Sequence, residues 1–217
     1  AAALAREYER LRLEAAYLQA QIQPHFLFNA FNSVMALSYI DTDRMRKLGD
    51  VFASFLRISF NYLNTGELVK LSHELELVRS YLYIEKERFG ERLSVIWNVG
   101  QAIELMLPPL SIQPLVENAV RHGLLSRSAG GTLTLTIARV QGGTKVEVQD
   151  NGRGMTEEQV QQLLATAMHE KNGIGIANTN RRLIHLYSQG LSIMSEPDVG
   201  TTVSFIIPHG AQDSPRK

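Results

Sequence analysis

The sequence predicts an α+β protein in which a helical N-terminal part precedes an α/β sandwich with helices on one face of a mixed sheet. Apolar residues recur at helical spacing from Leu4 to about Gly90. After Gly90 they alternate with polar residues, as they do in half-buried strands. Helical patterns interleave with these strands, which favours helices packed on a sheet. We therefore expect the boundary between the two parts near residue 90.

The first 23 residues have a heptad pattern. Charged residues flank its seam, which is typical of a coiled coil. The seam residues are Leu4, Leu11 and Leu18 at one position and Tyr8, Ala15 and Ile22 at the other. We predict a short coiled coil over 1–23, with one amphipathic helix packed on its own domain as the alternative.

Pro24 interrupts the helical pattern directly before His25. Proline has no N–H and its ring crowds the preceding turn, so we expect a kink there. Helix resumes over 28–40, and a second helix over 44–62 should be its antiparallel neighbour because the loop between them is short. A third helix is expected over 71–89. Because one hairpin leaves an apolar face uncovered, two copies would close a dimeric four-helix bundle.

The second part alternates strands and helices. The alternating apolar pattern predicts strands around 93–97, 133–137, 146–148 and 203–207, and helical spacing predicts helices over 110–124, 156–167 and 176–188.

Composition excludes several classes of protein. The chain has 217 residues, and its 22 basic and 22 acidic side chains balance, which argues against direct binding of nucleic acid. No cysteine is present, so there is no disulfide framework or thiolate metal site. No apolar run reaches the roughly 20 residues of a membrane span. The opening AAALAREYERL lacks an initiator methionine, and we read the chain as part of a longer protein.

The helix QPLVENAVRHG holds the first candidate site. Asn118, Arg121 and His122 lie at i, i+3 and i+4 and should share a face, whereas Glu117 points about 100° away. An amide, a guanidinium and an imidazole on one stripe suit a phosphate chain with Mg²⁺, which takes few protein ligands. The alternative is a solvated helix face.

Two glycine pairs follow in order. Asp150 ends a strand before Gly152 and Gly154, so a ligand could approach the backbone closely beside a carboxylate. Gly173 and Gly175 open a helix, where free N–H groups favour anions. The third glycine of the dinucleotide fingerprint is missing both times and no GxxxxGK[ST] loop exists, so neither the Rossmann nor the P-loop interpretation holds.

These motifs together resemble the GHKL (Bergerat) ATP-binding fold. The resemblance rests on Asn118 with Arg121-His122, the Asp150-Gly152-Gly154 stretch, Gly173-Ile174-Gly175, and Gly200-Thr201-Thr202 before the last strand. The segments PHFLFN, YIEKERF, LPPLSIQPLVENAVRHG and GIGIANTNRRL are similar to those of LytS-type sensor histidine kinases. The resemblance covers the chain from about Leu18 to Pro208.

The resemblance implies ATP and Mg²⁺ as cofactors and assigns a role to each site residue. His25 would be the phosphoacceptor, held by a hairpin that Phe26, Leu27 and Phe28 anchor. The nucleotide site would use Asn118 for Mg²⁺, Arg121 and His122 for phosphates, Asp150 for the adenine amino group beside Gly152 and Gly154, Gly173 and Gly175 for the lid and the phosphates, and Thr201 for the adenine pocket.

Three positions leave the chemistry open. Phe26 stands where many histidine kinases place an acid, so the general base is unassigned; Glu117 is a candidate, with a structural salt bridge as the alternative. Asn29 shares a helix face with His25 and is a candidate for phosphatase function, with an N-cap or interhelical hydrogen bond as the alternative.

The resemblance implies a protein-histidine kinase core with four segments: a coiled-coil signalling helix (1–23), dimerisation and phosphoacceptor helices (24–90), a GHKL catalytic domain (91–210) and a disordered tail (211–217). A homodimer would phosphorylate His25 and pass the phosphoryl group to an aspartate of a response-regulator receiver domain. It would be the cytoplasmic portion of a bacterial sensor, attached to the membrane only through an upstream segment. The alternatives are a GHKL ATP hydrolase, disfavoured because Pro114 replaces its base glutamate, and a non-catalytic nucleotide-binding scaffold.

Overall fold

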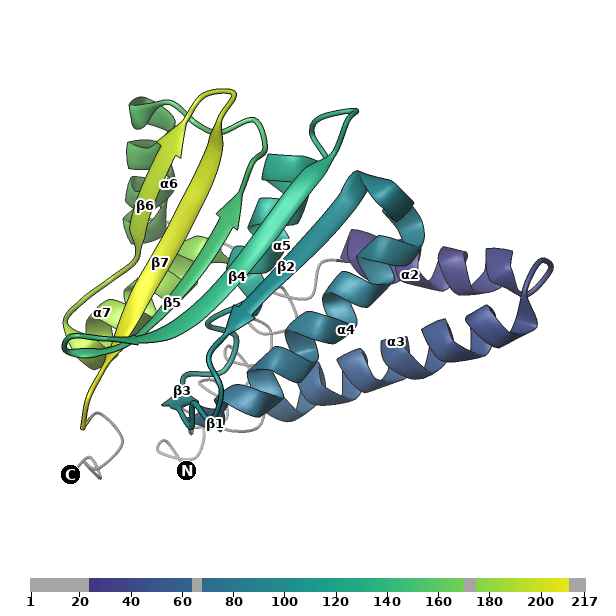
Figure 1. Cartoon of the computed structure of the whole chain (residues 1–217), viewed down its shortest axis with the longest axis horizontal. Helices are drawn as coiled ribbons and strands as arrows, with labels where there is room; N and C mark the ends of the chain where they lie inside the picture. The colour runs from purple at the N-terminus through teal and green to yellow at the C-terminus, as the bar shows by residue number, and fades with distance from the viewer. Residues whose placement is uncertain (1–23, 64–67, 170–174, 211–217) are drawn as a thin grey trace, which may run out of the picture.

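The computed structural model describes residues 24–63, 68–169 and 175–210. Three helices lie beside a five-stranded sheet that carries its own helices (Figure 1). The predicted α+β class, with a helical N-terminal part and a mixed sheet, is confirmed. The coiled coil expected over 1–23 and the tail expected over 211–217 fall outside the described residues.

The helical part consists of α2 (Pro24–Leu37), α3 (Thr42–Leu63) and α4 (Leu71–Phe89). Pro24 is the first residue of α2, where a missing N–H costs no helical hydrogen bond. The kink predicted at Pro24 involves the preceding segment, which the structure does not describe. The Asp41 carboxylate accepts the Arg44 N–H at 3.0 Å and so caps the first turn of α3.

Phe26 anchors the start of α2. Its ring is 7% exposed and lies 5.1 Å from the ring of Phe55 on α3 and 5.0 Å from that of Tyr81 on α4, measured between centroids. Phe28 was expected to anchor the hairpin too, but its side chain is 64% exposed. Helical geometry explains the difference, because a residue two positions after Phe26 lies on nearly the opposite side of the helix.

Five strands form the mixed sheet in the order β2-β4-β5-β7-β6. Only β2 and β4 pair in parallel; the other neighbours are antiparallel. The strands are β2 (Leu93–Val99), β4 (Gly131–Val140), β5 (Gly143–Asp150), β6 (Ser192–Glu196) and β7 (Gly200–Pro208). A short antiparallel pair, β1 (Val69–Lys70) with β3 (Met106–Leu107), lies apart from this sheet, and neither it nor β6 was predicted.

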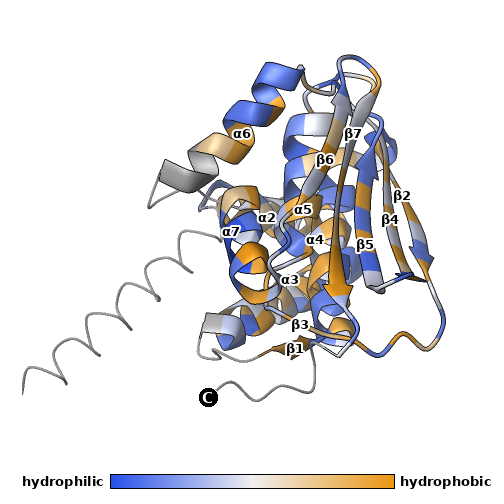
Figure 2. Ribbon diagram, turned by 90° about the vertical axis from the view of Figure 1, so that its left-hand side faces the viewer, coloured by the Kyte–Doolittle hydropathy of each residue, from blue (hydrophilic) through white to orange (hydrophobic). Residues whose placement is uncertain are grey.

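Helices α5 (Gln113–Asn118), α6 (Glu157–His169) and α7 (Ile176–Tyr187) gather on one side of the sheet (Figure 2). Alternate residues of β4 face these helices, and Leu133, Leu135 and Ile137 are fully buried there. The helices predicted over 156–167 and 176–188 match α6 and α7 closely.

The helix predicted over 110–124 differs in detail. It begins as α5 at Gln113, because Leu110 has a left-handed backbone (φ 57°) that no helix accepts. From Ala119 to Leu124 it continues as the π-helix η2. The fully buried carboxylate of Glu74 on α4 accepts N–H groups from Leu110 and Ile112 at 3.1 and 3.0 Å, which fixes this segment against the helical part.

Within the described ranges, no helix is long and apolar enough to cross a membrane.

Candidate nucleotide and phosphoacceptor sites

A cavity of about 290 Å³ opens between the α5–η2 helix, the end of β5 and helix α6. Five of the predicted site residues line it: Asn118, His122, Asp150, Gly154 and Thr201. Sequence reasoning missed the other wall, to which α6 contributes Gln159, Gln162 and Leu163. The lining combines two apolar side chains, Met155 and Leu163, with polar and charged ones, which suits a ligand that carries both a flat ring and charged groups.

Asp150 ends β5 at the floor of this cavity and is 5% exposed. One carboxylate oxygen accepts the Gly152 N–H at 2.8 Å. Burial raises the pKa of Asp150, and backbone N–H groups of Gly152 and Thr201 oppose that rise. A carboxylate fixed in this way can accept a hydrogen bond from an amino group of a ligand in the cavity.

Glycines set the distance between the helix and Asp150. A Cβ on Gly123 would lie 2.6 Å from a carboxylate oxygen of Asp150, and one on Gly152 would lie 2.2 Å from the Gly123 carbonyl oxygen. Only hydrogen fits between these backbones. Gly123 lines the cavity, whereas Gly152 was expected beside the ligand and instead packs against Gly123.

The α5–η2 helix has two functional faces rather than the single stripe expected. Asn118 and His122 line the cavity, whereas Arg121 does not and instead pairs with Glu117 at 3.7 Å. The π-turn explains this, because its wider i→i+5 turn keeps residues four apart nearly aligned and rotates residues three apart away from each other. Glu117 points away from the cavity residues, as helix geometry predicted.

The environment of His122 favours the neutral imidazole. Desolvation lowers the pKa of His122, and the positive charges of Arg121 and Arg153 lower it further. A neutral ring keeps one donor and one acceptor nitrogen for a ligand at the cavity wall.

Thr201 at the start of β7 belongs to a small hydroxyl network. Its hydroxyl lies 2.7 Å from that of Ser195 on β6, and the Ser195 hydroxyl accepts the Met155 N–H at 2.8 Å. The network ties β7 and the edge strand β6 to the segment after Gly154. Ser195 was not predicted, since a serine on a short edge strand carries no signal in the sequence.

The second glycine pair is only partly described. Gly173 lies outside the described residues. Gly175 precedes α7 with a φ of 86°, a conformation that favours glycine, and it does not line the cavity.

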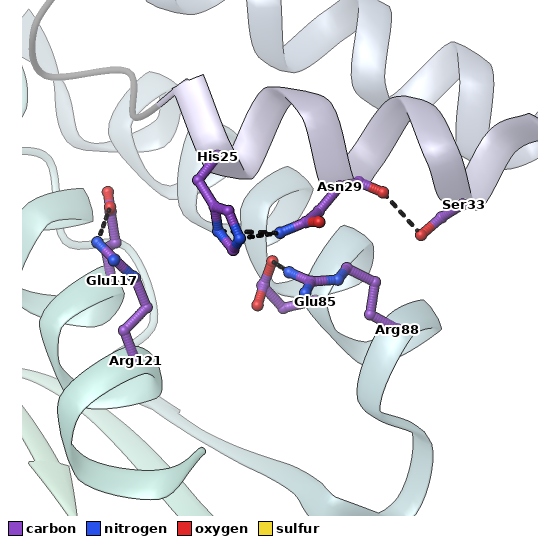
Figure 3. A network of polar contacts seen from close by, with 7 residues as sticks. All are labelled: His25, Asn29, Ser33, Glu85, Arg88, Glu117 and Arg121. Atoms are coloured by element: carbon purple, nitrogen blue, oxygen red, sulfur yellow. Dashed lines mark hydrogen bonds and ion pairs between the residues drawn. The ribbon is translucent and has the colours of Figure 1, made fainter. Parts of the chain in front are cut away.

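His25 lies in the first turn of α2 and is exposed. The amide nitrogen of Asn29 is 3.0 Å from its Nδ1 and 3.3 Å from its Nε2. In Figure 3 the imidazole projects from α2 between two ion pairs, Glu117–Arg121 and Glu85–Arg88. An exposed imidazole thus lies beside the helix of which another face lines the cavity.

Glu117 is partly buried, with its side chain 12% exposed, on the face of α5 that turns from the cavity toward α2 (Figure 3). Burial raises the pKa of Glu117 to about 7, and Glu85 raises it while Gln113 and Arg121 oppose the rise. Gln113 donates to one carboxylate oxygen at 3.3 Å.

Two family models match the chain in succession. Residues 13–93 match the histidine kinase model, and residues 110–211 match the model of histidine kinase-, DNA gyrase B- and HSP90-like ATPases. Together they define a histidine kinase core in which the helical N-terminal region precedes a GHKL ATPase domain.

Similar proteins narrow this class. The chain is 43% identical to the putative uncharacterized protein YwpD of Bacillus subtilis over 90% of this chain and 70% of that protein. It is 34% identical to the sensor histidine kinase YpdA of Escherichia coli and 37% identical to the sensor protein LytS of Bacillus anthracis, over 91% and 88% of this chain but about a third of either relative. The chain belongs to the LytS-type histidine kinase family.

Solved structures share the fold at low identity. The histidine kinase domain of the blue-light activated kinase EL346 of Erythrobacter litoralis matches with a TM-score of 0.53 at 16% identity, over 94% of this chain and 97% of that one. The catalytic domain of the histidine kinase ThkA matches with a TM-score of 0.51 at 15% identity, over 65% and 95%.

Proposed function

We propose that this chain transfers the γ-phosphoryl group of ATP to His25, within a homodimer, and then to an aspartate of a response-regulator receiver domain. The observation that carries the proposal is the two-faced α5–η2 helix. Its Asn118 and His122 line the cavity, and its Glu117 and Arg121 lie on the side of α2. One rigid element therefore connects the nucleotide cavity to the phosphoacceptor.

In this proposal the cavity holds Mg·ATP. Asp150 accepts from the adenine amino group, with Gly154 and Thr201 beside the base. His122 and the backbone amides around Gly173 and Gly175 contact phosphates.

The donor set of the cavity fits a magnesium ion bound mainly through phosphates and water. The Asn118 amide is available there, whereas the Asp150 carboxylate already accepts backbone N–H groups. Magnesium would neutralise the charge that develops on the phosphates during transfer.

The transfer itself needs placement more than covalent chemistry. A ring nitrogen of His25 attacks the γ-phosphorus, an N–P bond forms, and the P–O bond to ADP breaks. Arg121 is proposed to contact the phosphoryl group in transit, from the side of α2. Glu117 is proposed to accept the imidazole proton, since it is the carboxylate of α5 on that side. Asn29 is proposed to position the water that hydrolyses phosphohistidine, because it already contacts the ring.

Exposed apolar residues support the homodimer. Phe28, Phe31 and Met35 on α2 and Phe60 on α3 are 44% to 64% exposed. Phe28, Phe31 and Met35 follow helical spacing along one face of α2, and an exposed apolar face of this kind is typical of an interaction surface. A second copy of the hairpin would cover it as the four-helix bundle that the sequence predicts. Sedimentation at high concentration should give a dimer, and Phe31→Glu should give a monomer.

The chain spans about a third of YpdA and of LytS, and we propose that it is the cytoplasmic kinase core of a longer membrane-attached sensor.

Incubation with γ-labelled ATP and Mg²⁺ tests the function directly. We expect acid-labile, base-stable label on the protein that disappears in His25→Ala, while that variant still binds nucleotide. Free phosphate without protein label would favour the hydrolase, and neither product would favour the scaffold.

A further inference from the structure

The segment YIEKERF, at the end of α4, is part of the family resemblance but has no role in the proposed function. Its Glu85 and Arg88 pair at 3.1 Å, and the side chains are 3% and 23% exposed. Burying an ion pair gains little stability, because desolvation offsets the attraction. A pair at i, i+3 would form equally well at the surface, so the burial calls for another reason.

The packing of α2 places this pair next to His25. Phe26, the residue after His25, lies 5.0 Å from Tyr81, measured between ring centroids. Glu85 follows Tyr81 by one helical turn and shares its face. In Figure 3 the Glu85–Arg88 pair is drawn next to His25 and Asn29, on the side of α2 that packs on α4.

Electrostatics place the other charged groups in the same cluster. Burial raises the pKa of Tyr81, the charges of Glu85 and Glu117 raise it further, and those of Arg121 and Arg88 oppose the rise. Burial also raises the pKa of Glu85, and the positive charges of Arg88 and Arg121 oppose that rise. The charged and titratable groups of this cluster are Tyr81, Glu85 and Arg88 on α4 and Glu117 and Arg121 on α5–η2, and Figure 3 draws the four charged ones on either side of His25.

The contact with Asn29 leaves the tautomer of His25 unselected. The Asn29 amide nitrogen is nearly equidistant from the two ring nitrogens, at 3.0 and 3.3 Å. A neutral imidazole attacks phosphorus only through its unprotonated nitrogen, so a second partner must hold the N–H. An exposed imidazole changes rotamer within nanoseconds, so it can turn from Asn29 toward α4.

We propose that Glu85 is a positioning residue for the phosphoacceptor: its carboxylate accepts the ring N–H of His25 and Arg88 holds that carboxylate in place. This inference rests on the proposed phosphorylation of His25. The other ring nitrogen then carries the lone pair that forms the N–P bond as the P–O bond to ADP breaks. The positive charge that develops on the ring is stabilised by Glu85, as a buried carboxylate does for a catalytic histidine. After the transfer the proton leaves the ring nitrogen through water at this exposed position, with Glu117 as its proposed final acceptor.

Glu85→Gln tests this, because the amide keeps the shape and removes the charge. We expect the labelling rate at saturating Mg·ATP to fall by about tenfold to a hundredfold, with nucleotide affinity unchanged. Glu87→Gln is the control: Glu87 lies on the same helix and pairs with Arg44 on α3 at 2.7 Å, at a more exposed position. It should label like the parent chain.

A spectroscopic readout separates positioning from a structural role. Nitrogen-15 NMR of the histidine rings, assigned with His25→Ala, reports the ratio of the two tautomers. Glu85→Gln should move His25 toward the mixture found in free imidazole, and Glu87→Gln should not. If Glu85→Gln destabilises the fold, the double variant Glu85→Gln/Arg88→Gln leaves no unpaired buried charge and should show the same labelling loss.

Unchanged tautomers in Glu85→Gln would overturn the inference, as would equal labelling losses in the Glu85 and Glu87 variants. Absence of label in the parent chain would instead refute the proposed function, and the NMR comparison would still decide the role of Glu85.

Discussion

The two faces of the α5–η2 helix are built in different ways. On the cavity face, backbone approach sets the geometry, since Gly123 and Gly152 leave no room for a side chain beside Asp150. On the face toward α2, the partly buried ion pair between Glu117 and Arg121 sets the geometry. The geometry of the cavity face should therefore be disturbed by added side-chain volume, and that of the face toward α2 by the loss of a charge.

This difference implies that binding and transfer can be separated by mutation. A change on the cavity face should weaken nucleotide binding or metal placement. A change on the face toward α2 should slow phosphorylation of His25 and leave nucleotide affinity intact.

The largest effect is expected from Asn118→Ala. The side chain is the proposed magnesium ligand at the cavity wall, and transfer depends on charge neutralisation there. Labelling of His25 should fall by about a hundredfold or more. Asn98→Ala, at an exposed position on β2, is the control and should label normally. A rate for Asn118→Ala within twofold of the parent rate would remove the assignment.

Added volume tests the cavity face next. In Gly123→Ala the new Cβ would lie 2.6 Å from a carboxylate oxygen of Asp150 and would displace it. Nucleotide affinity, measured by titration calorimetry, should fall about tenfold, because the ligand would lose one hydrogen bond to a charged group. Asp150→Ala should weaken binding as well.

Gly49→Ala serves as the control for Gly123→Ala, because a Cβ at Gly49 on α3 meets nothing within 4 Å. Equal affinities in the two alanine variants would show that the close approach of Gly123 does not position Asp150.

Removing a charge tests the face of the α5–η2 helix that turns toward α2. Glu117→Gln removes the proposed proton acceptor and the partner of Arg121 while keeping the hydrogen-bonding shape. The labelling rate should fall about tenfold, and nucleotide affinity should stay within twofold of the parent value. Glu104→Gln, at an exposed position, is the control. If nucleotide affinity drops with the rate, the two faces are not independent.

Much of the cavity face could be predicted from the sequence because its determinants are local. A strand that ends in Asp150 and is followed by glycines indicates that another backbone or a ligand packs closely against it. This signal does not depend on how the rest of the chain folds. Helix α4 matches its predicted range of 71–89 for the same reason, since one apolar period runs through it without a break.

The face toward α2 could not be predicted in the same way. The π-turn after Asn118 changes which residues align, and no spacing rule for an α-helix contains it. Glu85 comes beside His25 only because Phe26 packs on Tyr81, a contact between residues 55 positions apart in the sequence. The cavity wall from α6 depends likewise on tertiary packing.

The smallest expected effect concerns His122, and it links the two faces through charge. Its pKa is lowered in the folded state by desolvation first and by Arg121 and Arg153 next. The folded chain therefore binds this proton less readily than the unfolded chain, whose histidine titrates at about 6.5. The stabilisation is complete above about pH 6.5 and is lost as the pH falls through the lower folded value. His122→Gln lacks this contribution, so its melting temperature relative to the parent chain should rise by about 1 °C between pH 7.5 and 5.5. His185→Gln, on α7, is the control. A melting-temperature difference that stays constant across this range would mean that the pKa of His122 is not lowered in the folded state.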